Sequence, residues 1–180
     1  MTTLFLDHYE SPIGTILLVT DERRCLRALD FADHEPRMRQ LLQRHYGTSE
    51  TLPLPAPTVI RDALDAYFDG DLQALSAIVW QTNGSLFQRQ VWAALGDIPA
   101  GTTQSYAELA AHIGKPNAVR AVGLANGANP VGIVVPCHRV IGANGKLTGY
   151  GGGIERKAWL LEHEGALPVA HTPNRMAAAI

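Results

Sequence analysis

The N-terminal part of the chain alternates between short apolar stretches and turn-forming clusters. The apolar stretches, at residues 3–9, 15–20 and 25–31, are rich in the residue types that favour strands. Residues 11–14 separate the first two stretches and residues 21–24 separate the second from the third, and both clusters favour turns. The pattern predicts a three-stranded meander.

Helical spacing replaces this pattern after Pro36. One helix is predicted to begin at Pro36, which suits a first helical position, and to stop at Gly47. Its apolar residues recur at helical intervals: Met38, Leu41, Leu42 and Tyr46. A second helix is predicted from Thr58 to Phe68, with Gly70 ending it. The prolines between the two helices predict a short, stiff connector: Pro53, Pro55 and Pro57.

A new capped helix begins just after Gly84, and this change predicts a domain boundary. Ser85 and Gln88 form a capping box in front of a helix with an apolar side. We therefore expect an α+β protein with an N-terminal domain at residues 1–83 and a helical domain at residues 84–167. The tail, residues 168–180, is expected to be flexible.

Residues 105–126 predict two helices joined by a tight turn. Ser105 and Glu108 form a second capping box, residues 114–116 (Gly-Lys-Pro) break the first helix, and Asn117 is expected to cap the next. This spacing is typical of a DNA-binding helix-turn-helix. The alternative is an ordinary packed helical hairpin, which the spacing alone favours because helix-turn-helix matches have many false positives.

The second of these helices, residues 118–126, consists mainly of small residues, with Arg120 as its only charge. Small side chains such as Ala118 and Gly123 allow a helix to approach a groove closely, with Arg120 as the projecting side chain. A turn containing Asn129 follows, and only about ten residues separate this helix from Cys137. A base flipped out of a duplex could therefore reach the sulfur.

Composition and charge narrow the classes of function. The chain has 180 residues, 46% hydrophobic and 18% charged, and no apolar run long enough to span a membrane. Without a signal-peptide pattern, a cytoplasmic protein with no membrane partner is expected. Residues 1–83 hold seven Lys and Arg against 12 Asp and Glu, and residues 84–165 hold seven against five. This balance permits contact with nucleic acid by the second half only, with a weak basic footprint.

Cys137 lies in an aliphatic run that continues to Ile141, and His138 follows it directly. Free cysteine is often a packed small hydrophobe, but a buried thiol beside a base is also a candidate nucleophile. Adjacent side chains diverge on a strand or a helix, so a bridging water is expected between Cys137 and His138. With only Cys25 in addition, and no Cys/His cluster at zinc spacing, we expect free thiols, no metal and no other cofactor.

A histidine that acts as a base needs a carboxylate to fix its tautomer. The last predicted helix, residues 154–164, places Glu162 and Glu164 in its final turn, where the helix dipole disfavours negative charge. Either residue could serve, or both could belong to a solvated helix end. Before this helix, residues 142–153 are rich in glycine and could present backbone N–H groups to a planar ligand, with Tyr150 alongside; the spacing is not that of a phosphate-binding loop.

Taken together, these motifs resemble the O6-alkylguanine-DNA alkyltransferases, in particular the bacterial constitutive type. The resemblance is strong from about Gly84 to Gly165 and looser before, where it implies a ribonuclease-H-like domain. The motifs in the family's order and spacing are Phe87–Trp92, Ser105–Ala110, Ala118–Gly123, Asn129–Pro130, Pro136–Arg139 (Pro-Cys-His-Arg), Gly149–Gly152 and Trp159–Gly165.

The resemblance implies a chemistry for the cysteine. Cys137 would take the alkyl group of O6-alkylguanine, and of O4-alkylthymine, in one irreversible step. Its proton would pass through a water to His138 and on to Glu164, which the resemblance selects over Glu162. The protein would act once, as a monomer on duplex DNA; cooperative binding is left open.

The resemblance also implies how DNA is held. Tyr106 would help to rotate the nucleotide out through the minor groove, and Arg120 would fill the vacated place in the stack. Further contacts would come from Ala118 and Gly123, with Asn129 as the hinge before the cysteine segment. The flipped base would meet the backbone around Cys137 and the remaining pocket residues: Val140, Tyr150 and Gly151.

The sequence departs from the family pattern at two positions, and two other functions are alternatives to alkyl transfer. Gly151 stands where some relatives have serine, which leaves the alkyl-size preference open, and Cys25 does not reproduce the zinc cluster of some relatives. A non-catalytic, lesion-flagging relative would lack the reactive cysteine, which is intact here. A cysteine hydrolase would turn over repeatedly, so the turnover number separates it from an alkyltransferase.

Overall fold

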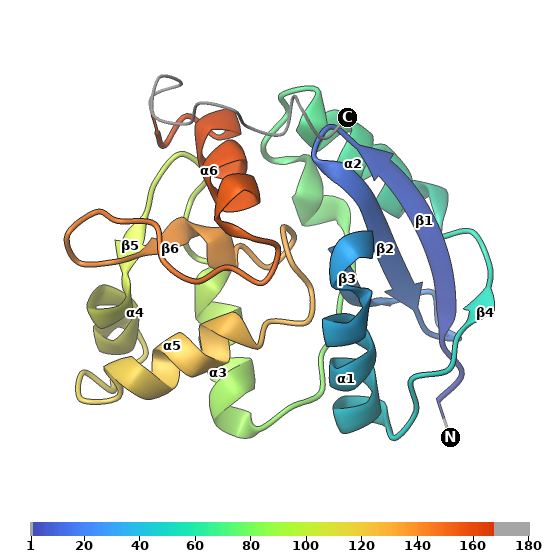
Figure 1. Ribbon diagram of the computed structural model, residues 1–180, viewed down its shortest axis with the longest axis horizontal. Coiled ribbons are helices and arrows are strands. Elements are labelled where there is room, and N and C mark those ends of the chain that lie inside the picture. Colours follow the sequence, from blue (N-terminus) through green and yellow to red (C-terminus); the bar gives the residue numbers. More distant parts are fainter. Residues whose placement is uncertain (1, 168–180) are drawn as a thin grey trace. The chain divides into compact units, whose positions relative to one another are not determined.

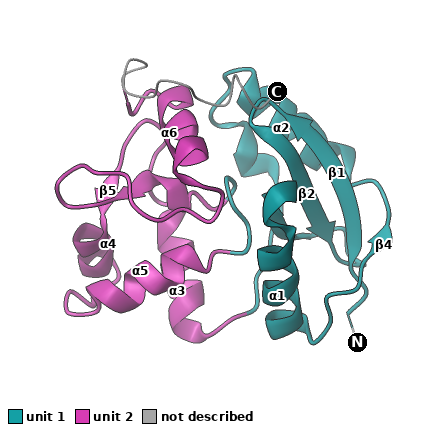
Figure 2. Ribbon diagram, viewed as in Figure 1, with its two compact units in different colours: residues 1–83, 130–134, 179–180 teal, residues 84–129, 135–178 magenta. Residues whose placement is uncertain are grey.

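A computed structural model describes residues 2–167, and the predicted flexible tail at residues 168–180 lies outside this range. The described residues form two compact units, shown in Figure 2. Unit 1 contains residues 2–83 and 130–134, and unit 2 contains residues 84–129 and 135–167. Five residues from the second half of the chain therefore group with the first unit. No helix within residues 2–167 has both the length and the apolar character needed to cross a bilayer.

Unit 1 is built on a four-stranded sheet in the order β3-β2-β1-β4. Its first three strands form the predicted meander: β1 (Phe5–Ser11), β2 (Gly14–Thr20) and β3 (Leu26–Phe31) pair antiparallel. A two-residue strand, β4 (Leu52–Pro53), adds to β1 in parallel, within a stretch that we predicted as a connector. Since Pro53 has no N–H to donate, its place at the sheet edge is the one that proline tolerates.

Helices close the unit around this sheet (Figure 1). A short 3-10 turn, η1 (Ala32–His34), leads into α1 (Glu35–Tyr46), which has a proline in its first turn and ends at Gly47 with φ 74°, as predicted. Apolar side chains from α1, from β2 and β3 and from the residue before β1 form one buried cluster: Leu4, Leu17, Val19, Ala28, Met38 and Leu42. The other helices are α2 (Thr58–Phe68) and η2 (Ala74–Ala77), and a 2.6 Å hydrogen bond from the Tyr9 hydroxyl to Asp65 ties α2 to β1.

Residues 130–134 join unit 1 through the edge strand β3. The Leu29 N–H donates to the Pro130 carbonyl at 3.0 Å, and the Gly132 N–H donates to the Leu29 carbonyl at 3.1 Å. The predicted strand leading into the cysteine is reduced to an isolated bridge between Leu29 and Val131. The cause is local, because Pro130 lacks an N–H and Ile133 adopts a φ of 67°, which interrupts an extended chain.

Unit 2 is mainly helical, with α3 (Leu86–Leu95), α4 (Tyr106–His112), α5 (Val119–Gly127) and α6 (Ile154–His163). Both predicted capping boxes, at Ser85 and Ser105, are confirmed. The predicted cap of α5 is wrong: Ala118 takes the N-cap position in place of Asn117, and no side chain caps the helix. The α5 helix also continues one residue beyond the predicted end at Asn126.

A small parallel pairing in unit 2 connects distant parts of the chain. Strand β5 (Gln104–Ser105) lies directly before α4, and β6 (Val140–Ile141) lies directly after the 3-10 turn η3 (Cys137–Arg139). Gln104 pairs with Val140 and Ser105 with Ile141. The pairing therefore anchors the start of α4 beside the segment that carries the cysteine (Figure 1).

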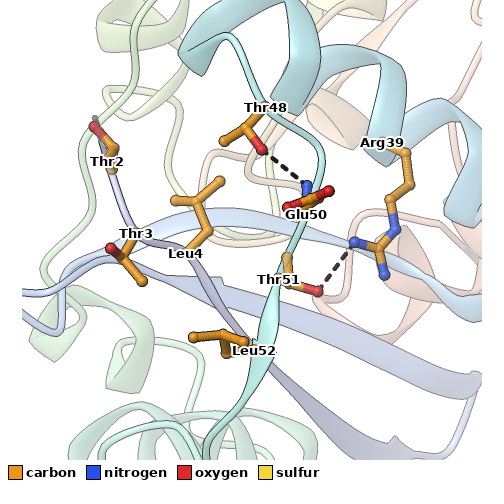
Figure 3. A pocket seen from close by; sticks show the side chains of 8 residues that line it. All are labelled: Thr2, Thr3, Leu4, Arg39, Thr48, Glu50, Thr51 and Leu52. Carbon is orange, nitrogen blue, oxygen red and sulfur yellow. Dashed lines mark hydrogen bonds between the residues drawn. The ribbon is translucent and has the colours of Figure 1, made fainter.

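Figure 3 shows a pocket of about 490 Å³ in unit 1, between the start of β1, the side of α1 and the approach to β4. Its lining residues are Thr2, Thr3, Leu4, Arg39, Thr48, Glu50, Thr51 and Leu52. Arg39 points toward Thr51 and donates to its hydroxyl at 3.0 Å, to the Ser49 carbonyl at 2.6 Å and to Glu35. Its guanidinium is therefore already used in holding the loop before β4 to α1.

Candidate active site

Cys137 begins the η3 turn and is 7% exposed. Its N–H donates to the Val135 carbonyl at 2.8 Å, and the Asn129 amide donates to the same carbonyl at 2.8 Å. On the other side, the Asn126 amide at the end of α5 lies 3.4 Å from the Cys137 carbonyl. Buried amides thus hold the backbone on both sides of the thiol, and one of them comes from α5 itself.

Behind the cysteine, three charged or ionisable side chains form a buried cluster. His138 Nε2 lies 2.9 Å from Glu164 Oε2, and both side chains are fully buried. Arg139 donates to Glu164 through Nε at 2.8 Å and through Nη2 at 2.9 Å, and through Nη1 to the Ile98 carbonyl at 2.6 Å. Glu164 is the C-cap of α6, so these contacts compensate a negative charge at the unfavourable end of a helix.

The charges in this cluster point to a neutral histidine. Burial lowers the pKa of His138 below its ordinary value, against the opposing effect of Glu164. Burial raises the pKa of Glu164, but the contacts with His138 and Arg139 outweigh it and hold that pKa well below its ordinary value. An ionised Glu164 requires the proton of a neutral imidazole on Nε2, so Nδ1 carries the lone pair. Nδ1 is buried and has no hydrogen-bond partner among the described residues.

The η3 turn keeps the cysteine and the histidine on different sides of the chain. Adjacent side chains on a 3-10 helix point about 120° apart, which follows from three residues per turn. The geometry is therefore neither the strand nor the α-helix we considered, but the side chains diverge in the same way. A water between Cys137 and His138 stays a prediction.

The residue predicted to rotate the nucleotide lies at the start of α4, and the residues predicted to hold the base lie in β6 and the glycine-rich loop. Tyr106 is the first residue of α4, and its hydroxyl lies 3.4 Å from the Thr148 carbonyl. The Tyr150 ring meets the His138 ring edge-on at 6.4 Å between centroids. Val140 is fully buried beside the cysteine turn, and Gly151 is half-buried next to Tyr150.

The residues predicted to contact DNA lie on and around α5. Arg120 is exposed and has no hydrogen bond or ion pair within residues 2–167. Gly123 and Leu124 follow one turn later on the same side of the helix, and Leu124 is 72% exposed. Gly123 lies against Tyr106, where a Cβ would be 3.7 Å from the ring. Ala118 is half-buried at the N-cap, whereas Asn129 is 2% exposed and acts within the protein.

A metal site was not expected, and no group of three or more His, Cys, Asp and Glu side chains in residues 2–167 could hold a metal ion.

Comparison with known proteins covers both units. Residues 4–79 match the family described as 6-O-methylguanine DNA methyltransferase, ribonuclease-like domain, and residues 86–166 match the DNA binding domain of the same methyltransferase. These matches take in most of the chain. The chain belongs to the 6-O-methylguanine DNA methyltransferase family.

Individual members of this family resemble the chain over nearly its whole length. The methylated-DNA–protein-cysteine methyltransferase of Mycolicibacterium paratuberculosis is 59% identical over 91% of this chain and 92% of the relative. That of Salmonella typhimurium is 48% identical over 93% and 99%. The crystal structure of Mycobacterium tuberculosis OGT in complex with DNA superposes with a TM-score of 0.74 at 41% identity, covering 94% of this chain and 98% of that one. The expected α+β fold, with a sheet domain followed by a helical domain, is confirmed.

Within this methyltransferase fold, three polar residues near the cysteine were not predicted: Asn126, Arg139 and Lys157. Arg139 was visible as part of Pro-Cys-His-Arg, but nothing local showed that it would pair with Glu164. Lys157 carried a detectable signal, because it shares helical phase with Leu160 and Leu161, which are buried. Asn126 was predicted as the last residue of its helix, but no local signal showed that its side chain would be buried and reach the Cys137 carbonyl.

Proposed function

We propose that this chain repairs DNA by moving the alkyl group of O6-alkylguanine to Sγ of Cys137. The thiolate attacks the alkyl carbon, a sulfur–carbon bond forms, and the carbon–oxygen bond breaks with its electron pair passing to guanine O6. The proton from the thiol passes through a water to Nδ1 of His138 and then to the departing guanine. Atoms and charge balance, since a thiol and an alkylated guanine become a thioether and guanine.

The observation that carries this proposal is the buried His138–Glu164–Arg139 cluster directly behind a buried thiol. Glu164 orients the imidazole and compensates the positive charge that His138 gains when it accepts a proton. The resemblance implies that the proton continues from His138 to Glu164. Because Arg139 holds the pKa of Glu164 below its ordinary value, we place the proton on His138 instead, with Glu164 staying ionised beside it. Because the product is a neutral thioether with no activated leaving group, the chain acts once.

The DNA partner is proposed to bind along α4 and α5, as a helix-turn-helix in the minor groove. Arg120 is exposed and free of partners within the described chain, which suits a side chain that enters the base stack. Tyr106 helps to rotate the nucleotide, and the flipped base lies between Val140, Tyr150 and Gly151. Ala118 and Gly123 leave room for the groove walls, and Asn129 holds the turn between α5 and the cysteine.

Several finer points belong to the same proposal. The substrate class includes O4-alkylthymine as well as O6-alkylguanine, the protein acts as a monomer on duplex DNA, and it works in the cytoplasm without a cofactor. The weak positive balance of residues 84–165 is consistent with affinity that depends on groove contacts as well as on phosphate neutralisation.

The test is a measurement of mass after incubation with duplex DNA that contains O6-methylguanine. We expect the Cys137 peptide to gain one methyl group and the reaction to stop at one equivalent of product per protein. Repeated turnover would point to a cysteine hydrolase, and methylation of Cys25 would show that the acceptor is misassigned. DNA binding without any transfer would identify a lesion-flagging protein.

A second prediction concerns Arg120. Arg120→Ala is expected to weaken binding to O6-methylguanine DNA and to slow transfer together, each by about 10- to 100-fold, since a stacked side chain contributes roughly 1–3 kcal/mol. Fluorescence anisotropy at a fixed salt concentration gives the affinity, and single-turnover kinetics give the rate. Arg89→Ala is the matched control, because it removes one exposed charge from α3 of the same unit. Equal losses of affinity and transfer rate in both variants would mean that Arg120 contributes only its positive charge and does not enter the base stack.

A further inference from the structure

Lys157 is a fully buried lysine in α6 that the mechanism above does not use. Its ammonium donates to the Val140 carbonyl at 2.6 Å and to the Thr148 carbonyl at 2.7 Å. Val140 begins β6, directly after the cysteine turn, and Thr148 lies in the glycine-rich loop. One side chain thus joins α6 to two segments that are proposed to line the base pocket.

The burial of this ammonium has no carboxylate to offset it. No Asp or Glu side chain in residues 2–167 lies within 4.0 Å of its nitrogen, and its hydrogen bonds go only to backbone carbonyls. An isolated buried ammonium is costly, so a nearby anion is expected to stabilise it. Burial lowers the pKa of Lys157 to about 8, and the negative charge of Cys137 acts in the opposite direction.

The other charged groups around Cys137 cancel one another. Arg139 and Glu164 form a doubly hydrogen-bonded pair, and His138 is neutral at rest. Among the described residues, Lys157 is a buried cation near Cys137 that no carboxylate neutralises, so its charge is available to a thiolate.

We propose that Lys157 is the positioning residue that stabilises the Cys137 thiolate and locks the glycine-rich loop against β6. The inference rests on the proposed role of Cys137 as the alkyl acceptor. The same loop carbonyl, that of Thr148, lies 3.4 Å from the Tyr106 hydroxyl, so Lys157 also fixes the partner of the residue proposed to rotate the nucleotide. The hydrogen bonds of Lys157 within the described residues go to backbone carbonyls, and its effect on the reaction passes through Cys137 and the loop.

The first test measures the reactivity of the thiol without DNA. In a Cys25→Ser background, the rate at which iodoacetamide modifies Cys137 is followed against pH by mass spectrometry, for the parent, Lys157→Met and Lys157→Arg. Methionine keeps the length of the side chain and removes its charge. We expect the midpoint of the profile to move up by about one pH unit in Lys157→Met, and by clearly less in Lys157→Arg, which keeps the charge. Unchanged midpoints in a folded Lys157→Met protein would overturn the proposal and leave a structural role only.

A second measurement needs no variant of the lysine. The nitrogen of Lys157 is titrated by NMR in the Cys25→Ser protein before and after methyl methanethiosulfonate converts the Cys137 thiol to a neutral disulfide. Because coupling between two groups is reciprocal, removing the thiolate should lower the pKa of Lys157. The same pKa before and after modification would overturn the inference even if Lys157→Met fails to fold.

The outcomes separate this inference from the proposed function. A parent protein that takes no methyl group from DNA contradicts the proposed function, but its iodoacetamide profile still tests Lys157. A parent that is methylated normally, with a profile that does not depend on Lys157, contradicts only the inference.

Discussion

A Cys137→Ser variant is expected to bind DNA containing O6-methylguanine and to transfer no measurable methyl group. The hydroxyl is close to the thiol in size, so the η3 turn and the amides that hold it should be retained. A serine hydroxyl, however, ionises far less readily than a thiol. A neutral histidine acting through a water is too weak a base to convert it to the alkoxide that would have to attack the alkyl carbon. Binding by anisotropy and transfer by mass spectrometry give the two readouts.

Cys25→Ser is the matched control for this change. Cys25 is half-buried in unit 1, and burial raises the pKa of its thiol, which makes it a poor nucleophile. The control should therefore transfer one methyl group as the parent does. Transfer by Cys137→Ser, or loss of transfer in Cys25→Ser, would place the acceptor elsewhere.

Local sequence signals predicted most of the helices and the meander. The capping boxes at Ser85 and Ser105, and the stop at Gly47, depend on residues within one helical turn of each other. The failures have a different origin. Strand β4 forms by pairing with the free edge of β1, and the bridge at Val131 forms by pairing with the free edge of β3. Both pairings join residues far apart in the sequence, so the local pattern of residues does not predict them.

The candidate site was predictable where it depends on residues close together in the sequence, and not where it depends on packing between distant segments. Cys137 and His138 are neighbours in sequence, and their motif is specific. The choice between Glu162 and Glu164 depended on the family resemblance, because which of the two reaches His138 depends on how α6 packs on η3. The Arg139 pairing crosses 25 residues of sequence, and no local rule predicts it.

Buried charge in unit 2 is arranged in two groups with different tasks. Arg139, Glu164 and His138 form a network whose members satisfy one another, and it can accept one proton without leaving an uncompensated charge. Lys157 stands apart with backbone partners only, so its charge stays available to the thiol. The cysteine lies where a proton acceptor and a fixed positive charge can act on it together.

Glu164→Gln is expected to lower both the rate of transfer and the stability of the fold. Glu164 Oε2 accepts from both His138 and Arg139, and the Gln carbonyl can take that place, but the –NH2 of Gln then faces Arg139 Nε and cannot accept from it. Arg139 is left as a buried charge without its counterion. Breaking a buried pair by removing one partner costs on the order of 3–5 kcal/mol. Loss of the group that orients the base should slow transfer by about 10²-fold or more. Single-turnover kinetics and urea unfolding measure the two effects.

The control and the pH dependence make this prediction specific. Glu162→Gln makes the same chemical change in the same helical turn and is expected to shift stability by less than about 1 kcal/mol and to leave transfer unchanged. The pKa of Glu164 in the folded state is depressed below its ordinary value of 4.5, so its stabilising contribution is complete above about pH 4.5 and is lost as the pH falls toward the folded-state pKa. The difference in unfolding free energy between the parent and Glu164→Gln should therefore be constant near neutral pH and shrink in acid. A difference that does not change with pH would mean that Glu164 is not ionised in the native protein, and the charge relay through His138 would then need another anion.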